Sequence, residues 1–140
     1  MAICEEKHLE KHDIEKTILI AEDDFISYKL LSCIVGATGV KVIWAMNGAE
    51  AVEICTENQD IDLVFMDISM PEMDGFEATS KIKELRNNLP IIIQSSFVDV
   101  KSIKKGFDSG CDEYINKPID KNIIYTLLNK YLVPAWKRSA

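Results

Sequence analysis

The chain has 140 residues, which suits one domain with a hydrophobic core of its own. Hydrophobic residues make up 47% of it and charged residues 28%, a balance that excludes an intrinsically disordered chain. The formal net charge of -7 disfavours nonspecific binding to nucleic acid or to an anionic membrane, and it suits metal ions or basic protein surfaces.

The two ends of the chain are expected to be tails around one folded unit. Residues 1–16 are too charged for the apolar core of a signal peptide, and we expect a tail or a linker there. Residues 17–132 are expected to form the domain, and residues 133–140 a short C-terminal tail. The longest apolar runs are too short to span a membrane.

The cysteines and histidines give no pattern of a metal site. The 4 cysteines, at positions 4, 33, 55 and 111, lie far apart and form no pair at metal-binding spacing. We interpret them as reduced thiols of a cytoplasmic protein, with Cys33 and Cys55 in the core. His8 and His12 have no further ligands nearby, so a solvated tail is expected there.

From residue 17 onward, short apolar runs that suit buried strands alternate with segments of helical spacing. Strands are expected at residues 17–21, 40–45, 63–66, 91–93 and 114–115. Helices are expected after each strand, with these inward-facing residues: Ile26, Leu30, Ile34 and Ala37; Ala51, Val52 and Cys55; Ala78, Ile82 and Leu85; Val100, Ile103 and Phe107; Ile124, Leu127, Leu128 and Tyr131. Helix ends are supplied by Gly36 or Gly39, by Gly110 and by Pro134.

Five strand–helix units predict a single three-layer α/β domain, in which helices cover both faces of a parallel sheet. Ligands of such folds bind beyond the carboxyl ends of the strands, so the residues that follow each strand are the candidates for function. These residues are Glu22, Asp23 and Asp24 after the first strand, Asp67 after the third, Ser95 and Ser96 after the fourth, and Lys117 and Pro118 after the fifth.

The residue types at the strand ends suit phosphoryl transfer with a metal ion. Crowded carboxylates repel one another, and a hard divalent cation such as Mg2+ relieves that repulsion. Lys117 can neutralise one phosphoryl oxygen, Ser95 can donate a hydrogen bond to another, and an aspartate carboxylate can attack phosphorus. No glycine-rich phosphate-binding motif is present, so a bound nucleotide is not the expected use of the metal.

Four sequence blocks together resemble a known family. The blocks "ILIAEDDF", "LVFMDISMPEMDGFEA", "PIIIQSS" and "GCDEYINKPID" stand in this order, each at an expected strand end. From Thr17 to Leu132 the chain resembles the receiver domain of two-component response regulators. The resemblance implies a flavodoxin-like (βα)5 fold with strand order 2-1-3-4-5. It also implies a phosphorelay in which the domain takes a phosphoryl group from a phosphohistidine.

Carried over by position, the resemblance assigns the site residues. It makes Asp67 the phosphoacceptor, and it makes Glu22 and Asp23 the acidic pair that binds Mg2+ beside Asp67. The backbone carbonyl of Ser69 would be a further metal ligand, and Mn2+ is the alternative ion. Lys117 takes the place of the family's lysine.

The resemblance also assigns a switch. Ser95 takes the place of the switch hydroxyl and Tyr114 that of the switch aromatic, although Tyr114 is equally well explained as a core residue. Phosphorylation would then change the face of the fourth helix, fifth strand and fifth helix. In this family the bond that corresponds to Lys117–Pro118 is typically cis. Asp24 is interpreted from its residue type as a helix N-cap.

The resemblance implies a histidine kinase or a histidine phosphotransfer domain as the partner. Direct binding to nucleic acid and membrane contact by this domain are not expected, and a weak dimer through the switch face is the expected form of self-association. The domain would promote its own phosphorylation and dephosphorylation without being a multiple-turnover enzyme. The charged leader favours an origin as the receiver of a hybrid histidine kinase, in the cytoplasmic part of a membrane-anchored sensor, over a stand-alone regulator.

Two other classes of function stay open. A phosphohydrolase of the haloacid-dehalogenase type also uses an aspartate after a strand, but it would want a second acid two places later, where Ser69 stands. A receiver-like scaffold that binds partners without phosphorylation would need neither the acidic residues nor Lys117.

Overall fold

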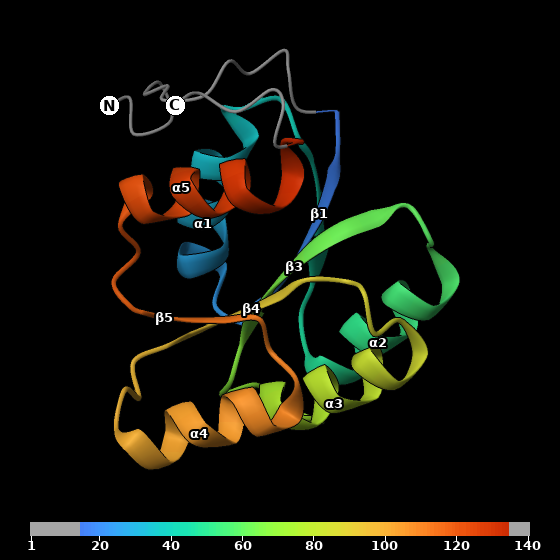
Figure 1. Cartoon of the computed structure of the whole chain (residues 1–140), viewed down its shortest axis with the longest axis vertical. Helices are drawn as coiled ribbons and strands as arrows, with labels where there is room; N and C mark the ends of the chain where they lie inside the picture. Colours follow the sequence, from blue (N-terminus) through green and yellow to red (C-terminus); the bar gives the residue numbers. More distant parts are fainter. Residues whose placement is uncertain (1–14, 135–140) are drawn as a thin grey trace.

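The computed structural model describes residues 15–134, which form one layered α/β domain (Figure 1). Within these residues, a 5-stranded parallel sheet has the order β2-β1-β3-β4-β5. The strands are β1 (Thr17–Ala21), β2 (Lys41–Ala45), β3 (Ile61–Asp67), β4 (Ile91–Ser95) and β5 (Glu113–Asn116). The helices are α1 (Phe25–Gly36), α2 (Gly48–Glu57), α3 (Gly75–Leu85), α4 (Val100–Ser109) and α5 (Lys121–Leu132). The predicted fold and strand order are confirmed.

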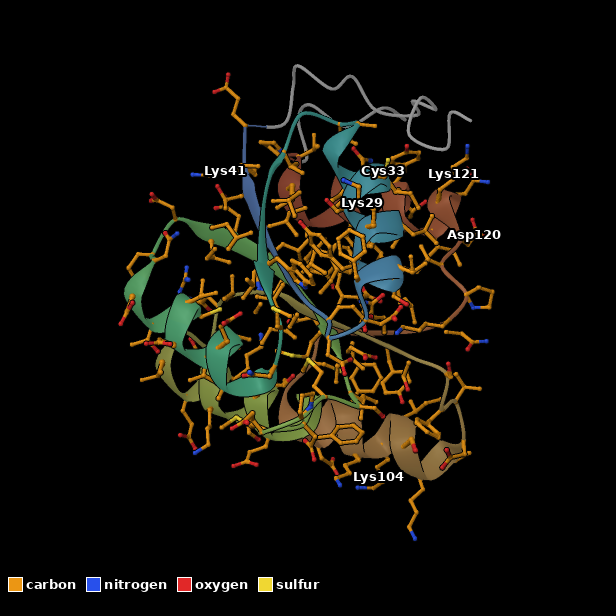
Figure 2. All side chains as sticks on the ribbon, turned by 180° about the vertical axis from the view of Figure 1, so that it is seen from behind. Lys29, Cys33, Lys41, Lys104, Asp120 and Lys121 are labelled. Atoms are coloured by element: carbon orange, nitrogen blue, oxygen red, sulfur yellow. The ribbon has the colours of Figure 1, made fainter. Side chains whose placement is uncertain are left out.

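Two hydrophobic clusters fill the space on the two faces of the sheet (Figure 2). Helices α1 and α5 cover one face, and α2, α3 and α4 lie on the other (Figure 1). The central strand β3 shows why the sequence pattern is continuous rather than alternating, because Leu63 and Phe65 belong to one cluster while Val64 and Met66 belong to the other. Asp67, at the carboxyl end of this strand, therefore lies at the centre of the domain.

Four expected inward-facing residues are exposed instead. Ile26 of α1 is 72% exposed, since α1 turns Leu31, Ile34 and Val35 into the core. Leu85 is 59% exposed at the last position of α3. Val100 and Phe107 of α4 are 84% and 49% exposed. Helical spacing identifies an apolar face, but a helix with apolar residues on more than one side does not specify which side packs.

Among the cysteines that the structure describes, Cys33 differs from the prediction of reduced thiols. Cys33 is disulfide-bonded and half-buried, because separation along the chain does not set separation in space. Cys55 and Cys111 are free and buried, as reduced thiols would be. Burial raises the pKa of Cys55 to about 11, so this thiol is unreactive at neutral pH. Cys4, His8 and His12 lie outside the described residues.

Side chains at the helix starts and the loop after β3 position the strand ends. Asp24 is the N-cap of α1 and accepts a hydrogen bond of 2.8 Å from the Ser27 amide, which confirms its predicted role. A Cβ at Gly75 would lie 2.1 Å from the Asp67 carbonyl oxygen, so only glycine lets α3 start against the end of β3. The Gly75 amide donates to the Ile68 carbonyl at 2.9 Å and closes that loop.

Candidate functional site

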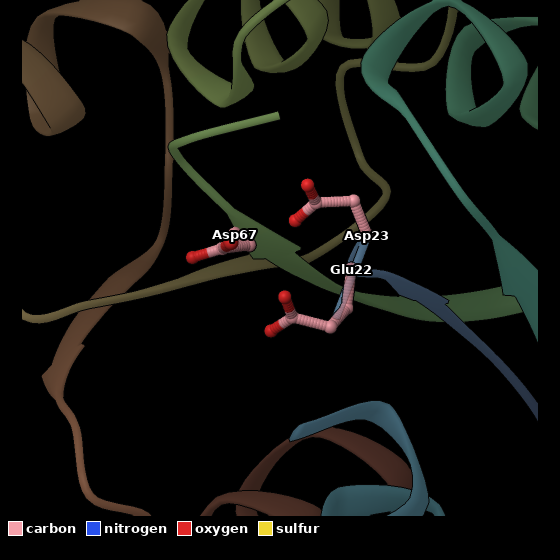
Figure 3. Close-up of side chains that lie close together, drawn as sticks. All are labelled: Glu22, Asp23 and Asp67. Carbon is pink, nitrogen blue, oxygen red and sulfur yellow. The ribbon is translucent and has the colours of Figure 1, made fainter. Parts of the chain in front are cut away.

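Three carboxylates meet at the carboxyl ends of β1 and β3. Glu22 and Asp23 directly follow β1, and Asp67 is the last residue of β3. Each offers a carboxylate oxygen, and the three oxygens lie within 4.8 Å of one another (Figure 3). Glu22 and Asp67 are buried whereas Asp23 is exposed, so the group opens to solvent on the Asp23 side. The sequence predicted this meeting, because the carboxyl ends of parallel strands lie at one edge of the sheet.

Lys117 joins the carboxylates from the end of β5. Its Nζ lies 2.9 Å from Glu22 Oε1 and 3.2 Å from Asp67 Oδ1. Burial raises the pKa of Glu22, the charge of Asp67 adds to that effect, and the hydrogen bond from Lys117 opposes it. Burial lowers the pKa of Lys117, but the hydrogen bond to Glu22 and the two negative charges outweigh it, so the pKa lies above its ordinary value. The Lys117 ammonium is therefore charged at neutral pH.

The lysine is positioned by the backbone that surrounds it. The Lys117 amide donates to the Ser95 carbonyl at 2.9 Å, and the Lys117–Pro118 peptide bond is cis, as the resemblance implied. Lys117, which follows the edge strand β5, thus reaches the Glu22 carboxylate at the end of β1, although β4 and β3 lie between these two strands. Sequence reasoning placed Lys117 at this edge but did not predict that Glu22 would be its nearer partner.

Trp44, in the edge strand β2, forms a hydrogen bond that fixes the acidic segment after β1. This contact was not predicted from the sequence. The indole Nε1 of Trp44 donates to the Glu22 carbonyl at 2.7 Å, while the Glu22 amide donates to the Ala45 carbonyl at 3.0 Å. The indole stacks on Tyr28 with ring centroids 4.2 Å apart. Both backbone groups of Glu22 are fixed by β2 in this way, which sets the direction of its carboxylate. An aromatic residue near the end of an edge strand was the available signal.

Ser95 and Tyr114 meet at the backbone of Phe97. Ser95 ends β4, is buried, and accepts a hydrogen bond of 2.9 Å from the Phe97 amide through its Oγ. The Tyr114 hydroxyl donates to the Phe97 carbonyl. Burial raises the pKa of Tyr114, and a hydrogen bond with Ser95 acts in the opposite direction. The two predicted switch residues therefore lie together, joined through one loop residue.

The donor set of the acidic group fits a hard divalent cation. Carboxylate oxygens are the ligands that Mg2+ prefers in proteins, and the open side at Asp23 leaves room for the waters that Mg2+ keeps. Ser69 lies in the exposed segment two residues after Asp67, and its predicted role as a carbonyl ligand stays a prediction. No softer cysteine or histidine ligand belongs to this group within the described residues.

Comparisons with known proteins agree with this fold. The family described as "Response regulator receiver domain" matches residues 18–129. The polar-differentiation response regulator DivK of Brucella anthropi is 35% identical over 123 residues, which cover 84% of this chain and 96% of DivK. Probable histidine kinase 6 of Oryza sativa subsp. japonica is 29% identical over 147 residues, which cover 91% of this chain but only 15% of the kinase.

A solved structure shows the same architecture. The CheX–CheY–BeF3–Mg complex from Borrelia burgdorferi matches with a TM-score of 0.80 and 26% identity, over 89% of this chain and 99% of that one. Among residues 15–134, none of the helices combines the length and the apolar character needed to cross a membrane. With the family matching most of its length, the chain belongs to the response regulator receiver domains of two-component signalling.

Proposed function

We propose that Asp67 is the phosphoacceptor of this receiver domain and takes a phosphoryl group from a phosphohistidine. The observation that carries the proposal is the position of the Asp67 carboxylate, at the end of the central strand and 3.2 Å from Lys117 Nζ. Asp67 is 7% exposed, and the exposed side of the acidic group at Asp23 is where an incoming phosphoryl group would approach it.

The chain's own residues supply most of the chemistry of transfer. A carboxylate oxygen of Asp67 forms the new bond to phosphorus as the bond from phosphorus to the imidazole nitrogen breaks, and the electron pair stays on that nitrogen. The Lys117 ammonium neutralises charge on one phosphoryl oxygen. The Ser95 hydroxyl donates a hydrogen bond to another oxygen while Oγ keeps its contact with the Phe97 amide.

A divalent cation would complete the site. Glu22, Asp23 and Asp67 would hold Mg2+, with the Ser69 carbonyl as a further ligand and Mn2+ as the alternative ion. When bound, the ion supplies positive charge against the phosphoryl oxygens. The similar CheX–CheY complex from Borrelia burgdorferi contains BeF3 and Mg, which supports this assignment by likeness.

The signal would leave the site through Ser95, Phe97 and Tyr114. A new phosphoryl group adds about two negative charges at Asp67, which draws the Ser95 hydroxyl toward it. Since Ser95 and Tyr114 both bind the backbone of Phe97, a movement of Ser95 biases the position of Tyr114. The face formed by α4, β5 and α5 then changes by a population shift between two packings.

The partner and the parent protein belong to the same proposal. A histidine kinase or a histidine phosphotransfer domain would donate the phosphoryl group, and the α4-β5-α5 face would form any weak dimer. The chain spans nearly the whole of DivK but a small part of the rice kinase, so its likeness fits both a stand-alone regulator and the receiver of a hybrid kinase. We retain the hybrid origin and the cytoplasmic location as predictions.

The alternative functions are not favoured. Membership of the receiver family argues against a haloacid-dehalogenase phosphohydrolase, and Ser69 occupies the place where that class needs its second acid. A scaffold that works without phosphorylation would have no use for Lys117 bound between two buried carboxylates, because burying charge is costly unless it is paired.

A phosphorylation time course tests the proposal. The chain is incubated with acetyl phosphate, with and without Mg2+, and the phosphorylated fraction is followed by intact-mass spectrometry at neutral pH. Wild type should gain one phosphoryl group in the presence of Mg2+, whereas Asp67→Asn should gain none. Asp62→Asn, in the same strand but away from the acidic group, is the matched control. Phosphorylation of Asp67→Asn at the wild-type rate would show that the assignment of Asp67 is wrong.

A further inference from the structure

Gly106 lies in the middle of α4, where a glycine weakens a helix. Glycine is less favourable than alanine at an interior helical position, because it loses more backbone freedom on folding. Gly106 is neither at a helix end nor in a backbone conformation that needs glycine, since α4 continues to Ser109 and positive φ among the described glycines occurs at Gly39 and Gly110. Some contact other than backbone geometry must account for this residue.

The ring of Tyr114 occupies the space that a side chain at position 106 would need. A Cβ built on Gly106 would lie 2.7 Å from Cδ2 and 2.9 Å from Cε2 of Tyr114, closer than real Cβ contacts come. The next nearest atom is Cδ1 of Ile93 at 3.4 Å, an ordinary contact. Gly106 is also the buried residue of α4 among those described. The space that a side chain at position 106 would occupy is therefore filled by the Tyr114 ring.

The seated ring is connected to the phosphorylation site through Phe97. With its ring against Gly106, Tyr114 donates its hydroxyl to the Phe97 carbonyl. The Phe97 amide donates to Ser95 Oγ at 2.9 Å. A side chain at position 106 would displace the ring and move the hydroxyl away from Phe97, although Ser95 itself would be untouched.

We propose that Gly106 is a positioning residue that seats the ring of Tyr114 against α4 and so connects α4 to Ser95 through Phe97. The part that concerns signalling rests on the proposed function of Asp67 and Ser95. The part that concerns the ring stands on geometry alone. Gly106 sets the population of the conformation in which the Tyr114 ring packs against α4. A larger residue at position 106 shifts the balance toward a conformation in which the ring is displaced.

Nuclear magnetic resonance of tyrosine rings tests the seating directly. The full chain is labelled with 13C at the tyrosine ring positions, and the Tyr114 signal is identified by its loss in Tyr114→Phe. Wild type should show a nuclear Overhauser effect between the Tyr114 ring and the α-protons of Gly106. Gly106→Ala should shift the Tyr114 signal and leave those of Tyr28, Tyr125 and Tyr131 in place. An unshifted Tyr114 signal in Gly106→Ala would overturn the proposal.

A matched control and a second measurement keep the test decisive. Gly36 also lies in a helix, but a Cβ there would meet nothing within 4 Å, so Gly36→Ala should leave the Tyr114 signal unchanged. Gly106→Ala should lower the midpoint of thermal unfolding, whereas the same change in a Tyr114→Ala background should not lower it. An equal loss in both backgrounds would overturn the proposal, and this comparison remains available if the single variant folds poorly.

Adding Mg2+ and beryllofluoride separates the two proposals. The ring measurements are first made without either, so their outcome does not depend on phosphorylation. With beryllofluoride present, the Phe97 amide signal should shift in wild type, and the Tyr114 signal should move with it. In Gly106→Ala the Phe97 shift should remain while the Tyr114 response is lost. No shift at all in wild type would contradict the proposed function of Asp67 and leave the seating by Gly106 standing.

Discussion

The two helices that flank β5 are anchored very differently. Helix α5 buries five residues, Ile124, Tyr125, Leu127, Leu128 and Leu132. Helix α4, on the other face, buries Gly106 among its described residues and leaves Val100 and Phe107 largely exposed. Little apolar area holds α4 to the sheet, so moving it costs less free energy than moving α5. We therefore expect a switch built around β5 to move α4 before α5.

The proposed phosphorylation site, Asp67, is connected to α4, the more weakly packed of the two helices. Ser95 and Tyr114 both bind the backbone of Phe97, which lies between β4 and α4. Lys117 follows β5 and is held by Glu22 and Asp67, so it ties that strand to the acidic group. Packing against the anchored helix α5 holds β5 in place, so that α4 can shift relative to β5.

The largest expected difference between the two helices is in packing energy. Leu128 is fully buried in α5, so Leu128→Ala should lower the free energy of unfolding by about 2–5 kcal/mol. Phe107 is 49% exposed in α4, and Phe107→Ala should lower it by less than about 1 kcal/mol. Urea unfolding followed by circular dichroism measures both. Equal losses would break the comparison.

A smaller effect is expected from the polar contacts that tie β5 to α5. Glu113 accepts hydrogen bonds from Lys130 at 2.7 Å and from the Tyr131 hydroxyl at 2.6 Å. Burial raises the pKa of Glu113, but these hydrogen bonds outweigh it, so the pKa lies below its ordinary value. A lowered folded-state pKa adds stability above the unfolded value of about 4.3, and this stability is lost as the pH falls through the folded value.

Tyr131→Phe should reduce that pH dependence. Because the pair is partly exposed, we expect a loss of at most about 1 kcal/mol at pH 7, and a smaller difference from wild type near pH 3. Urea unfolding across this pH range measures it, with Tyr28→Phe as a control outside the network. A loss in Tyr131→Phe that stays the same at every pH would contradict the role of Glu113.

The smallest effect is expected at the exposed pair on α4. Lys104 projects from α4 into solvent (Figure 2) and lies 2.7 Å from Asp108, with the two side chains 73% and 64% exposed. Exposed pairs of this spacing contribute about 0.3–0.5 kcal/mol at most. Lys104→Met should therefore change the free energy of unfolding by no more than that, and the change should vanish in 1 M salt. A loss above 1 kcal/mol, roughly twice the range for such pairs, would mean that α4 is better anchored than its burial indicates.

The sequence predicted the strand ends well because two simple rules act there. Buried strands of a parallel sheet are continuous apolar runs, and their carboxyl ends share one edge, so Asp67 and Lys117 could be expected to meet Glu22. The side of a helix that packs was harder to predict. In α4, Val100 and Phe107 carry the apolar signal, yet both are exposed and the buried residue of this helix is Gly106.

Contacts between distant side chains could not be predicted from the sequence. Nothing in the spacing of Trp44 and Glu22 indicates the indole hydrogen bond, and nothing indicates that the Tyr114 ring fills the space beside Gly106. Such contacts depend on how two elements approach in space. A glycine inside a helical pattern was the available signal, because a residue that weakens a helix needs a separate reason to be there.

Amide hydrogen exchange, read by mass spectrometry with and without Mg2+ and beryllofluoride, tests most directly whether a phosphoryl group at Asp67 is sensed by α4. In wild type we predict a change in exchange at Phe97 and along α4, with α5 unchanged. In Asp67→Asn we predict no change in either helix. A response of equal size in α5, or a response in α4 that persists in Asp67→Asn, would contradict this description of the switch.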